Sequence, residues 1–276
     1  MTMGTRSLEF IGNATTLLRL GPFTLLTDPN FLHQGDRAYL GKGLSSKRRT
    51  EPSRQPRDLP RVDAVVLSHL HGDHFDRIAR RELDRGLPVF TTPSAAKKLT
   101  RWGFGESVGM RTWTEQVLES GTARLRVVSA PGEHAPGWAR SLLPPVMGSV
   151  LELSDNAGRP FRVYITGDTL YRHWLREVTD RCGPVDAMVI HLGGTRVLGL
   201  LVTMDDHQGA DLVELIRPDV TVPIHYDDYH AFRSPLKDFV SSWRTRRLPG
   251  TLRTVARGQA VSLTPERAAN RIPTQD

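Results

Sequence analysis

His69-Leu70-His71-Gly72-Asp73-His74 packs three imidazoles and one carboxylate into six residues. An apolar run directly before it, residues 62–68 (VDAVVLS), predicts a buried β-strand. Imidazole nitrogens and carboxylate oxygens are the ligands that Zn²⁺ and related divalent ions prefer. In an extended segment His69 and His71 project to the same side, whereas Asp73 and His74 follow as the chain turns toward a helix. The hexad therefore predicts that the first pair holds one metal ion and that the second pair faces another.

This combination is rare enough in a chain of this composition to be treated as a motif. Histidine fills 10 of 276 positions. A chance match to the four polar residues of the hexad anywhere in the chain has a probability of about 1 in 1000. The alternative is a polar surface loop with clustered histidines, and the apolar strand that precedes the hexad argues against it.

Length and composition are those of a globular protein. The 276 residues allow a sizeable core and predict a single domain over residues 1–276. No apolar run reaches the roughly 18 residues that span a bilayer, and residues 1–7 lack the apolar segment of a secretory signal. A single cysteine, Cys182, excludes an internal disulfide framework and suits a reducing compartment. We therefore expect a cytoplasmic protein, either monomeric or oligomeric.

The net charge of +7 favours anionic partners. The excess is mostly arginine and is concentrated in residues 42–61 and 244–257. The first segment is a candidate for holding a substrate phosphate, with a solvated face as the alternative. Neither segment carries the interleaved aromatic residues of a nucleic-acid stacking platform, so nucleic acid is not expected as the partner.

Strands and helices alternate along the chain. Strands are predicted over residues 8–11, 15–20, 23–27, 62–68, 88–91, 123–130, 149–153, 161–166, 187–191 and 220–224, and helices over 76–83, from 94, and over 171–179, 205–216 and 235–243. Residues 62–67 (VDAVVL) are echoed at 185–190 (VDAMVI), which indicates two similar halves. This order favours an α/β (α+β) fold in which sheets pack together with helices outside.

One hexad supplies four ligands, which is too few for two ions. Three further candidates, His134, Asp168 and His225, each follow the end of an apolar strand. Ligands that arise from several strand ends are held rigidly while facing solvent. Taken singly, each has a structural alternative, because Gly167-Asp168-Thr169 also reads as a turn and a strand-end histidine is often an ordinary polar residue. Together with the hexad, the three are predicted metal ligands.

The hexad, His134, the Gly167-Asp168-Thr169 turn and His225, in this order, resemble the metallo-β-lactamase superfamily of metal-dependent hydrolases from about Leu8 to about Arg257. The chain is most similar to the branch that holds N-acyl-phosphatidylethanolamine-hydrolysing phospholipase D and ascorbate-6-phosphate lactonase-like proteins. This likeness rests on residues 11–15 (IGNAT) and Thr27-Asp28-Pro29, with Asn13 where the branch typically has histidine. Residues 204–207 (MDDH) also resemble a family segment in which a histidine near the substrate precedes a helix.

The resemblance implies a four-layer αβ/βα sandwich with two divalent metal ions at one end of the sheets. The ions would be zinc, with manganese or iron as alternatives. The first ion would be held by His69, His71 and His134, the second by Asp73, His74 and His225, and Asp168 would bridge the two. Asp28 and Asp76 would accept hydrogen bonds from ligand imidazoles, with turn or capping roles as the alternative.

The predicted activity is hydrolysis of a phosphodiester or a linear or cyclic ester in a small anionic or amphiphilic substrate. A hydroxide held by two metal ions would attack, Asp73 would orient it, and His207 or a water would protonate the leaving group. The loops 30–60 and 135–148 are candidate substrate lids.

Two other functions compete with this one. One is a nuclease acting on RNA or DNA. Members of the superfamily that process RNA usually bring an exosite insertion or an added domain, and the gaps of 34 residues (His134 to Asp168) and 57 residues (Asp168 to His225) leave no room for a large insertion. A non-catalytic metal-binding protein is the third candidate.

Overall fold

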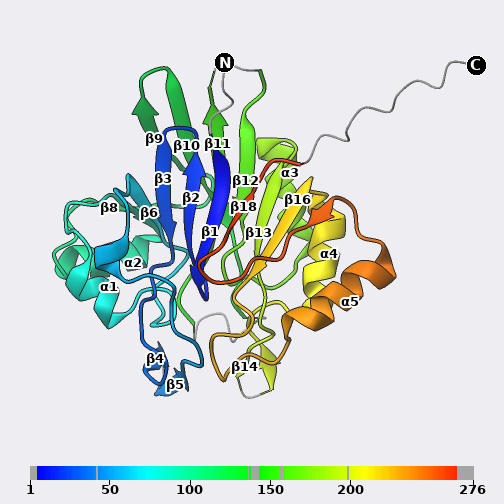
Figure 1. The fold of residues 1–276 in the computed structure, drawn as a ribbon, viewed down its shortest axis with the longest axis horizontal. Helices are drawn as coiled ribbons and strands as arrows, with labels where there is room; N and C mark the ends of the chain where they lie inside the picture. The colour runs from blue at the N-terminus through cyan, green and yellow to red at the C-terminus, as the bar shows by residue number, and fades with distance from the viewer. Residues whose placement is uncertain are drawn as a thin grey trace, which may run out of the picture.

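Two seven-stranded sheets lie face to face, with helices on their outer sides (Figure 1). This computed structural model describes residues 5–41, 43–135, 137, 143–155, 158–197 and 199–265. The strand order is β18-β1-β2-β3-β6-β7-β8 in the first sheet and β17-β16-β13-β12-β11-β10-β9 in the second.

The first sheet is antiparallel in one half and parallel in the other. β18, β1, β2 and β3 pair antiparallel, whereas β3, β6, β7 and β8 run parallel. Gly21, with φ of 58°, closes the β2–β3 hairpin between the two predicted strands 15–20 and 23–27. The strands are β1 (Arg6–Gly12), β2 (Thr15–Leu20), β3 (Phe23–Thr27), β6 (Ala64–Val66), β7 (Val89–Thr91), β8 (Ser107–Gly109) and β18 (Ala260–Ser262).

The second sheet repeats this plan. β9 to β12 pair antiparallel, and β12, β13, β16 and β17 run parallel. β6 and β13, which carry the repeated VDA sequence, both open the parallel half of their sheet, so the two similar halves are confirmed. The strands are β9 (Glu115–Ser120), β10 (Ala123–Pro131), β11 (Met147–Ser154), β12 (Phe161–Ile165), β13 (Ala187–His191), β16 (Val220–Ile224) and β17 (Thr251–Leu252).

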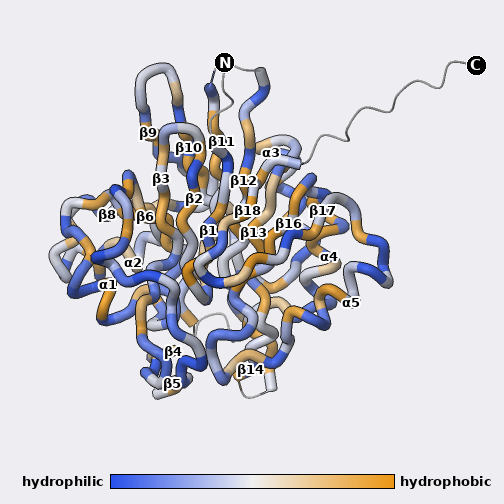
Figure 2. The backbone as a smooth tube through the Cα atoms, viewed as in Figure 1, coloured by the Kyte–Doolittle hydropathy of each residue, from blue (hydrophilic) through white to orange (hydrophobic). Residues whose placement is uncertain are grey.

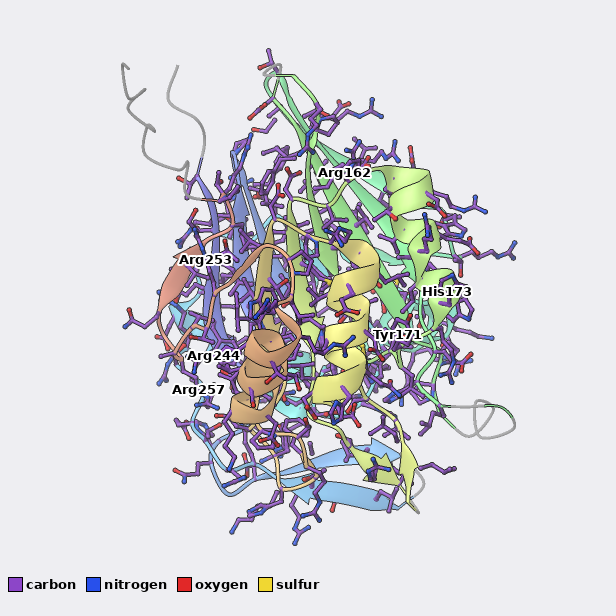
Figure 3. All side chains as sticks on the ribbon, turned by 90° about the vertical axis from the view of Figure 1, so that its right-hand side faces the viewer. Arg162, Tyr171, His173, Arg244, Arg253 and Arg257 are labelled. Atoms are coloured by element: carbon purple, nitrogen blue, oxygen red, sulfur yellow. The ribbon has the colours of Figure 1, made fainter. Side chains whose placement is uncertain are left out.

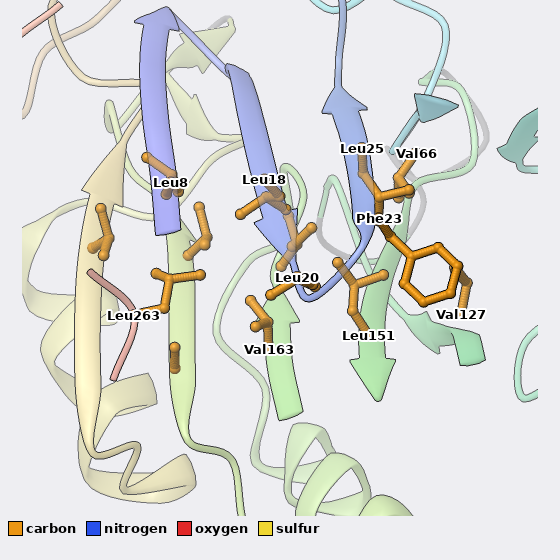
Figure 4. Packing of buried hydrophobic residues seen from close by; sticks show 14 of the residues in the cluster. Leu8, Leu18, Leu20, Phe23, Leu25, Val66, Val127, Leu151, Val163 and Leu263 are labelled. Atoms are coloured by element: carbon orange, nitrogen blue, oxygen red, sulfur yellow. The ribbon is translucent and has the colours of Figure 1, made fainter. Parts of the chain in front are cut away.

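Three hydrophobic clusters hold the layers together. Between the sheets, Leu18 and Leu20 pack with Leu151 and Val163 (Figure 4). The neighbouring Leu17 points the other way, into the cluster under the helices, because successive side chains of a strand alternate between faces. Figure 2 shows the resulting concentration of hydrophobic positions along the central strands.

Helices cover both outer faces and complete the predicted four-layer αβ/βα sandwich. α1 (Arg77–Glu82) and α2 (Pro93–Arg101) pack on the first sheet. The second sheet carries α3 (Glu177–Cys182), α4 (Asp206–Ile216) and α5 (Leu236–Arg246). Among the described residues, no helix is long and apolar enough to cross a membrane.

The structure departs from the predicted elements in several places. Five short strands, β8, β14 (Arg196–Val197), β15 (Leu200–Leu201), β17 and β18, were not predicted. β9 was not predicted, because its exposed, polar sequence forms a strand only through pairing with β10. The helix predicted over 171–179 is instead a short 3₁₀ turn (His173–Arg176) followed by α3. α2 begins at Pro93, one residue earlier than predicted, with Thr92 as its N-cap. The loop 30–60 contains a hairpin of β4 (Arg37–Gly41) and β5 (Leu44–Lys47) and a 3₁₀ turn (Pro56–Asp58).

Both arginine-rich segments contribute ion pairs to the fold. Arg48 is fully buried; its Nη1 donates to the side-chain oxygen of Asn30 at 2.5 Å, and its Nη2 lies 3.5 Å from Asp228. Arg54 donates to Glu9 at 2.5 Å. Arg48 and Arg54 are therefore engaged within the fold and are not free to bind a substrate phosphate.

In the later segment, Arg246 of α5 pairs with Asp211 and Glu214 of α4 at 2.8 and 2.7 Å. Arg257 pairs with Asp228 at 3.2 Å. Figure 3 looks onto α4 and α5 and labels Arg244, Arg253 and Arg257 around them. The paired arginines of this segment therefore hold α4, α5 and the C-terminal strands in place.

Candidate metal centre

All seven predicted donor residues follow the carboxyl ends of strands. The hexad follows β6, and His134, Asp168 and His225 follow β10, β12 and β16. Because β10, β12 and β16 run in the same direction in the second sheet, their carboxyl ends meet at one edge. The structure brings the seven side chains together in two buried groups.

The first group consists of His69, His71 and His134. One nitrogen from each ring lies within 4.8 Å of the others. His71 Nδ1 is 3.0 Å from His69 Nε2 and 3.4 Å from His134 Nε2. His134 Nδ1 donates to the backbone oxygen of Val202 at 2.6 Å, which turns its Nε2 toward the other two imidazoles. Three imidazoles in this arrangement can hold one metal ion.

The second group consists of Asp73, His74, Asp168 and His225. His74 Nε2 lies 3.1 Å from an Asp168 oxygen, and His225 Nε2 lies 3.5 Å from an Asp73 oxygen. His225 Nδ1 donates to the backbone of Leu192 at 3.0 Å, which again leaves Nε2 for the group. Two carboxylates and two imidazoles can hold a second ion.

Glycines fix two of the loops that present these donors, the Asp168 turn and the hexad. A Cβ on Gly167, whose φ is +62°, would lie 2.7 Å from the backbone oxygen of Met147, so only glycine allows the turn that places Asp168. A Cβ on Gly72 would lie 2.7 Å from the backbone nitrogen of Tyr39 in β4. Gly72 also donates to the backbone oxygen of Tyr39 at 2.9 Å, so the β4–β5 hairpin rests on the hexad.

Burial and neighbouring charges set the protonation of both groups. Burial and the nearby imidazoles hold the pKa of His69 well below its usual value and lower that of His71 to about 3. Burial alone would raise the pKa of Asp168, but His225 and His74 hold it well below its ordinary range. At neutral pH the described site therefore offers unprotonated imidazoles in the first group and ionised carboxylates in the second, as metal binding requires.

The pKa of His74 is shifted in the opposite direction from those of His69 and His71. Burial alone would lower its pKa, but the carboxylates of Asp168, Asp73 and Asp28 raise the pKa well above the usual histidine value. Three carboxylates around one imidazole favour a positive charge at this position, which either a proton or a metal ion supplies.

The hydrogen bonding of the site also fits metal ions. Asp73 Oδ1, Asp168 Oδ1 and His225 Nε2 are buried and have no hydrogen-bond partner among the described residues. A buried polar atom without a partner costs free energy, and such atoms are rare in folded proteins. Three of them in the second group, all nitrogen or carboxylate oxygen, match the donor set of Zn²⁺, Mn²⁺ or Fe ions.

Asp28 lies beside this site, as predicted from the Thr27-Asp28-Pro29 turn. Its Oδ2 is 3.0 Å from His74 Nδ1 and accepts from Ser68 Oγ at 2.9 Å. Burial opposes ionisation, but His74 and His191 lower the pKa of Asp28 to about 2. The hydrogen bond from Nδ1 leaves His74 Nε2 facing Asp168, and the predicted contact of Asp28 with a hexad imidazole is confirmed.

His191, at the end of β13, was missed by the sequence analysis. Its side chain is fully buried, with Nε2 3.4 Å from Asp28 Oδ2, and it forms a third group with Asp28 and His74. The sequence contains the necessary indication, because His191 ends an apolar strand in the same way as His225. The repeat of residues 62–67 at 185–190 points to it as well, since each copy is followed closely by a histidine.

The prediction for Asp76 is wrong. Asp76 is the N-cap of α1 and accepts from the backbone nitrogens of Ile78 and Ala79, both at 2.8 Å. Its second oxygen accepts from the backbone nitrogens of Phe31 and Leu32. All four partners are backbone groups, so the alternative role of helix capping is the one the structure shows.

His207 is not brought into the site. Its side chain is 80% exposed, and its ring lies 3.9 Å from Asp206 at the start of α4. It does not line the pocket over the donor groups. Asp205 is the N-cap of α4, and the residues of this helix that pack on the sheet begin at Gly209. This arrangement leaves His207 on the solvent side.

Asn13, which stands where the branch named in the sequence analysis typically has histidine, has a structural role. Its φ of 56° is in the left-handed region, which asparagine tolerates better than most residues. The side-chain amide donates to the backbone oxygen of Asp73 at 2.6 Å, and the backbone oxygen of Asn13 accepts from the His225 nitrogen at 3.0 Å. Asn13 thus ties together two of the loops that carry donor residues.

A pocket opens over the two groups and is lined by five of the seven donor residues: His71, Asp73, His134, Asp168 and His225. The candidate lid 30–60 contributes Leu40 from β4, and the candidate lid 135–148 contributes Leu143. Residues 136 and 138–142 of the second lid lie outside the described residues. Lid action by either loop stays a prediction.

Asp28→Asn is expected to weaken metal binding by about 10- to 100-fold, because the uncharged amide no longer polarises and orients His74. The measurement is competition for the metal against a chelator of known affinity at fixed pH. Asp76→Asn is the matched control: it removes a buried carboxylate that contacts only backbone nitrogens, so it is expected to lower stability but leave metal affinity within about twofold. Equal metal affinities in the two variants would contradict the role given to Asp28.

Comparison with known proteins identifies similar sequences and folds. Residues 24–226 match the family described as the beta-lactamase superfamily domain. A protein of Anaeromyxobacter sp. (strain K) named as a metal-dependent hydrolase is 29% identical over 196 residues, which cover 68% of this chain and 67% of that protein.

Two solved structures share the fold. One, from Veillonella parvula, is described as a possible metal-dependent hydrolase; it has a TM-score of 0.79 at 21% identity, covering 94% of this chain and 100% of that one. The other is an isothiocyanate hydrolase from Delia radicum gut bacteria, with a TM-score of 0.78 at 19% identity, covering 94% and 99%. At these identities the structural matches establish the fold.

Proposed function

Because this chain belongs to the metallo-β-lactamase superfamily, we propose that it is a metal-dependent hydrolase that uses two divalent metal ions to cleave an ester or phosphodiester bond. One observation carries the proposal: seven nitrogen and carboxylate donors converge beneath a pocket, and three atoms of the second group are buried without a hydrogen-bond partner among the described residues. The similar protein of Anaeromyxobacter, which is named as a metal-dependent hydrolase, supports it.

The two groups of side chains define the two proposed metal sites. His69, His71 and His134 would hold one ion, and Asp73, His74 and His225 the other. Asp168 would serve both ions, as the resemblance implies: one of its oxygens lies 3.1 Å from His74, and its charge also acts on His69 and His134 of the first group. Zinc is the proposed metal, with manganese and iron as alternatives, since all three accept nitrogen and oxygen ligands.

When bound, the ions would supply a water of lowered pKa and offset the negative charge that develops on the substrate. Residues of the chain would orient the attacking water. Asp73 lines the pocket, and its pKa is lowered because His74 and His225 outweigh the effect of burial. Its free Oδ1 would accept a hydrogen bond from the attacking water and orient it. Since His207 lies outside the pocket, we assign protonation of the leaving group to a solvent water.

The bond cleaved is proposed to be a linear or cyclic ester, or a phosphodiester, in a small or amphiphilic molecule. Support comes from the similarity of residues 11–15 and of Thr27-Asp28-Pro29 to the phospholipase D and lactonase branch. The solved isothiocyanate hydrolase shares this fold, so an isothiocyanate belongs among the test substrates.

The test is an assay of the purified, zinc-loaded protein with p-nitrophenyl esters, lactones, bis-p-nitrophenyl phosphate and a benzyl isothiocyanate. We expect turnover of at least one ester or phosphodiester, with loss of that turnover when His69 or Asp168 is replaced by Ala. Absence of turnover on every compound by a protein carrying its full complement of metal would favour a non-catalytic metal-binding protein.

A further inference from the structure

The walls of the pocket are apolar. Apart from the donor residues, three threonine or tyrosine residues and six apolar residues line it. The apolar ones are Leu40, Leu143, Val197, Val202, Ala231 and Phe232. They come from the β4–β5 hairpin, from the end of the second lid, from the segment around β14 (Arg196–Val197) and β15 (Leu200–Leu201), and from the loop after His225. The β4–β5 pair and the β14–β15 pair lie at the same end of the molecule (Figures 1 and 3). The substrate therefore enters between hydrocarbon surfaces.

Among the described residues that line this pocket there is no lysine or arginine. Arg48, on the hairpin side, is buried against Asn30 and Asp228. Arg196, beside Val197, has its side chain 52% exposed and lies 3.9 Å from Asp205. An anionic group on the substrate, away from the metal ions, would lose its hydration here without gaining a partner from the described lining.

One polar side chain of the pocket wall, that of Thr195, has an unsatisfied hydroxyl group. Thr195 is more than nine-tenths buried, and its Oγ1 has no hydrogen-bond partner among the described residues. The backbone of Thr195 is fixed on both sides: its nitrogen donates to Thr203 Oγ1 and its oxygen accepts from the nitrogen of Val202, both at 2.8 Å. The hydroxyl of Tyr229 is already engaged, donating to Asn30 at 2.8 Å. Thr195 thus presents an unused donor and acceptor in a rigid frame.

We infer that this site takes a neutral carboxylic ester or lactone with a short apolar chain, and that the Thr195 hydroxyl makes a hydrogen bond to a substrate oxygen. This inference rests on the proposed function and narrows it. The apolar walls supply the affinity for the chain, and Thr195 fixes its orientation over the donor groups. The overall positive charge of the protein then has no part in recognising the substrate within the described pocket.

Substituting Thr195 tests the hydrogen bond. In zinc-loaded protein, Thr195→Val is expected to raise KM for p-nitrophenyl butyrate about tenfold, the effect of one lost hydrogen bond, and to change kcat less. It should weaken binding of butyranilide, a neutral amide analogue, by the same factor in calorimetry, with metal content unchanged. Thr195→Ser keeps the hydroxyl, so its KM for p-nitrophenyl butyrate and its affinity for butyranilide should lie close to those of the parent protein.

Thr221→Val is the matched control. Thr221 Oγ1 is also buried without a partner, but it lies in β16 and does not line the pocket. The control is expected to stay within about twofold of the parent protein in KM and in butyranilide binding. KM and butyranilide affinity within twofold of the parent in Thr195→Val would overturn the role of Thr195.

The charge preference is tested with two esters of equal chain length and the same reacting bond. p-Nitrophenyl butyrate ends in a methyl group, whereas p-nitrophenyl hemisuccinate ends in a carboxylate. We expect kcat/KM to be at least about tenfold higher for the butyrate. Val197→Arg should reduce that ratio about tenfold, whereas Val197→Gln, similar in length but uncharged, should leave the ratio unchanged.

The outcomes separate the two proposals. Equal or faster cleavage of the hemisuccinate, or preference for bis-p-nitrophenyl phosphate, would overturn the inference while leaving the hydrolase intact. If neither an ester nor a phosphodiester is cleaved, the proposed function fails, and butyranilide binding to the parent, Thr195→Val and Thr221→Val proteins still decides whether the pocket binds neutral apolar molecules.

Discussion

Asp168→Ala is expected to abolish hydrolysis and metal retention together. Asp168 is the one carboxylate assigned to both proposed metal sites, and the tight turn at Gly167 places it there. Its loss leaves His74 and His225 without the charge that raises their pKa values, so protons and metal ions are both held less strongly. We expect kcat/KM to fall by at least about 10³-fold and the metal content to fall by half or more. Steady-state kinetics and elemental analysis of the same preparation measure the two effects.

Asp180→Ala is the control for this experiment. Asp180 lies in α3, its side chain is 58% exposed, and its partner Arg176 is 3.7 Å away. Exposed pairs of this kind contribute little to stability, so the control should match the parent protein in activity and metal content. Full metal content with full activity in Asp168→Ala would refute the assignment, and His69→Ala offers an independent check on the first group.

Removing the metal is expected to abolish turnover while leaving the fold in place. The main core lies between the two sheets, in residues such as Leu18, Leu151 and Val163, and none of these contacts involves a donor residue. Dialysis against a chelator should therefore lower activity by at least about 10³-fold without loss of the far-ultraviolet circular dichroism spectrum.

The melting temperature should drop on depletion, because a ligand that binds only the folded state adds about 2.7 kcal/mol at 100 times its dissociation constant. Adding zinc, manganese or iron back should restore activity, and the metal that restores most identifies the preferred ion. Turnover that survives complete depletion would contradict a metal-dependent mechanism. Unfolding of the depleted protein would show that the metal ions hold the sheets together as well.

The strand ends made the site predictable from sequence. The donors of the hexad, His134, Asp168 and His225 all follow apolar runs, and parallel pairing in the second sheet brings such ends to one edge. Local pattern could therefore place the side chains without knowledge of their contacts. The same rule, applied consistently, would have included His191.

Other features depended on contacts that the sequence does not display. Asp76 and Asp28 are both acidic residues near the hexad, but Asp76 faces backbone nitrogens and Asp28 faces imidazoles. β9 exists only because β10 pairs with it, and β4 and β5 pair within a polar loop. For His207 the helical period indicates a solvent-facing position, because the buried residues of α4 begin at Gly209 and lie on the opposite face of the helix.

Several expectations stay predictions. These are the specific branch of the superfamily, zinc as the metal, a cytoplasmic location and the oligomeric state. In place of the expected anionic substrate we propose a neutral one, because Arg48 and Arg54 are engaged in the fold and no lysine or arginine is among the described residues that line the pocket.

Anomalous diffraction from crystals of the zinc-loaded protein, recorded on both sides of the zinc absorption edge, tests the central claim most directly. The account predicts two anomalous peaks, one among His69, His71 and His134 and the other among Asp73, His74 and His225, with Asp168 in contact with both. No peak at these residues in a metal-loaded crystal, or peaks only at histidines on the surface, would contradict the proposed two-metal site.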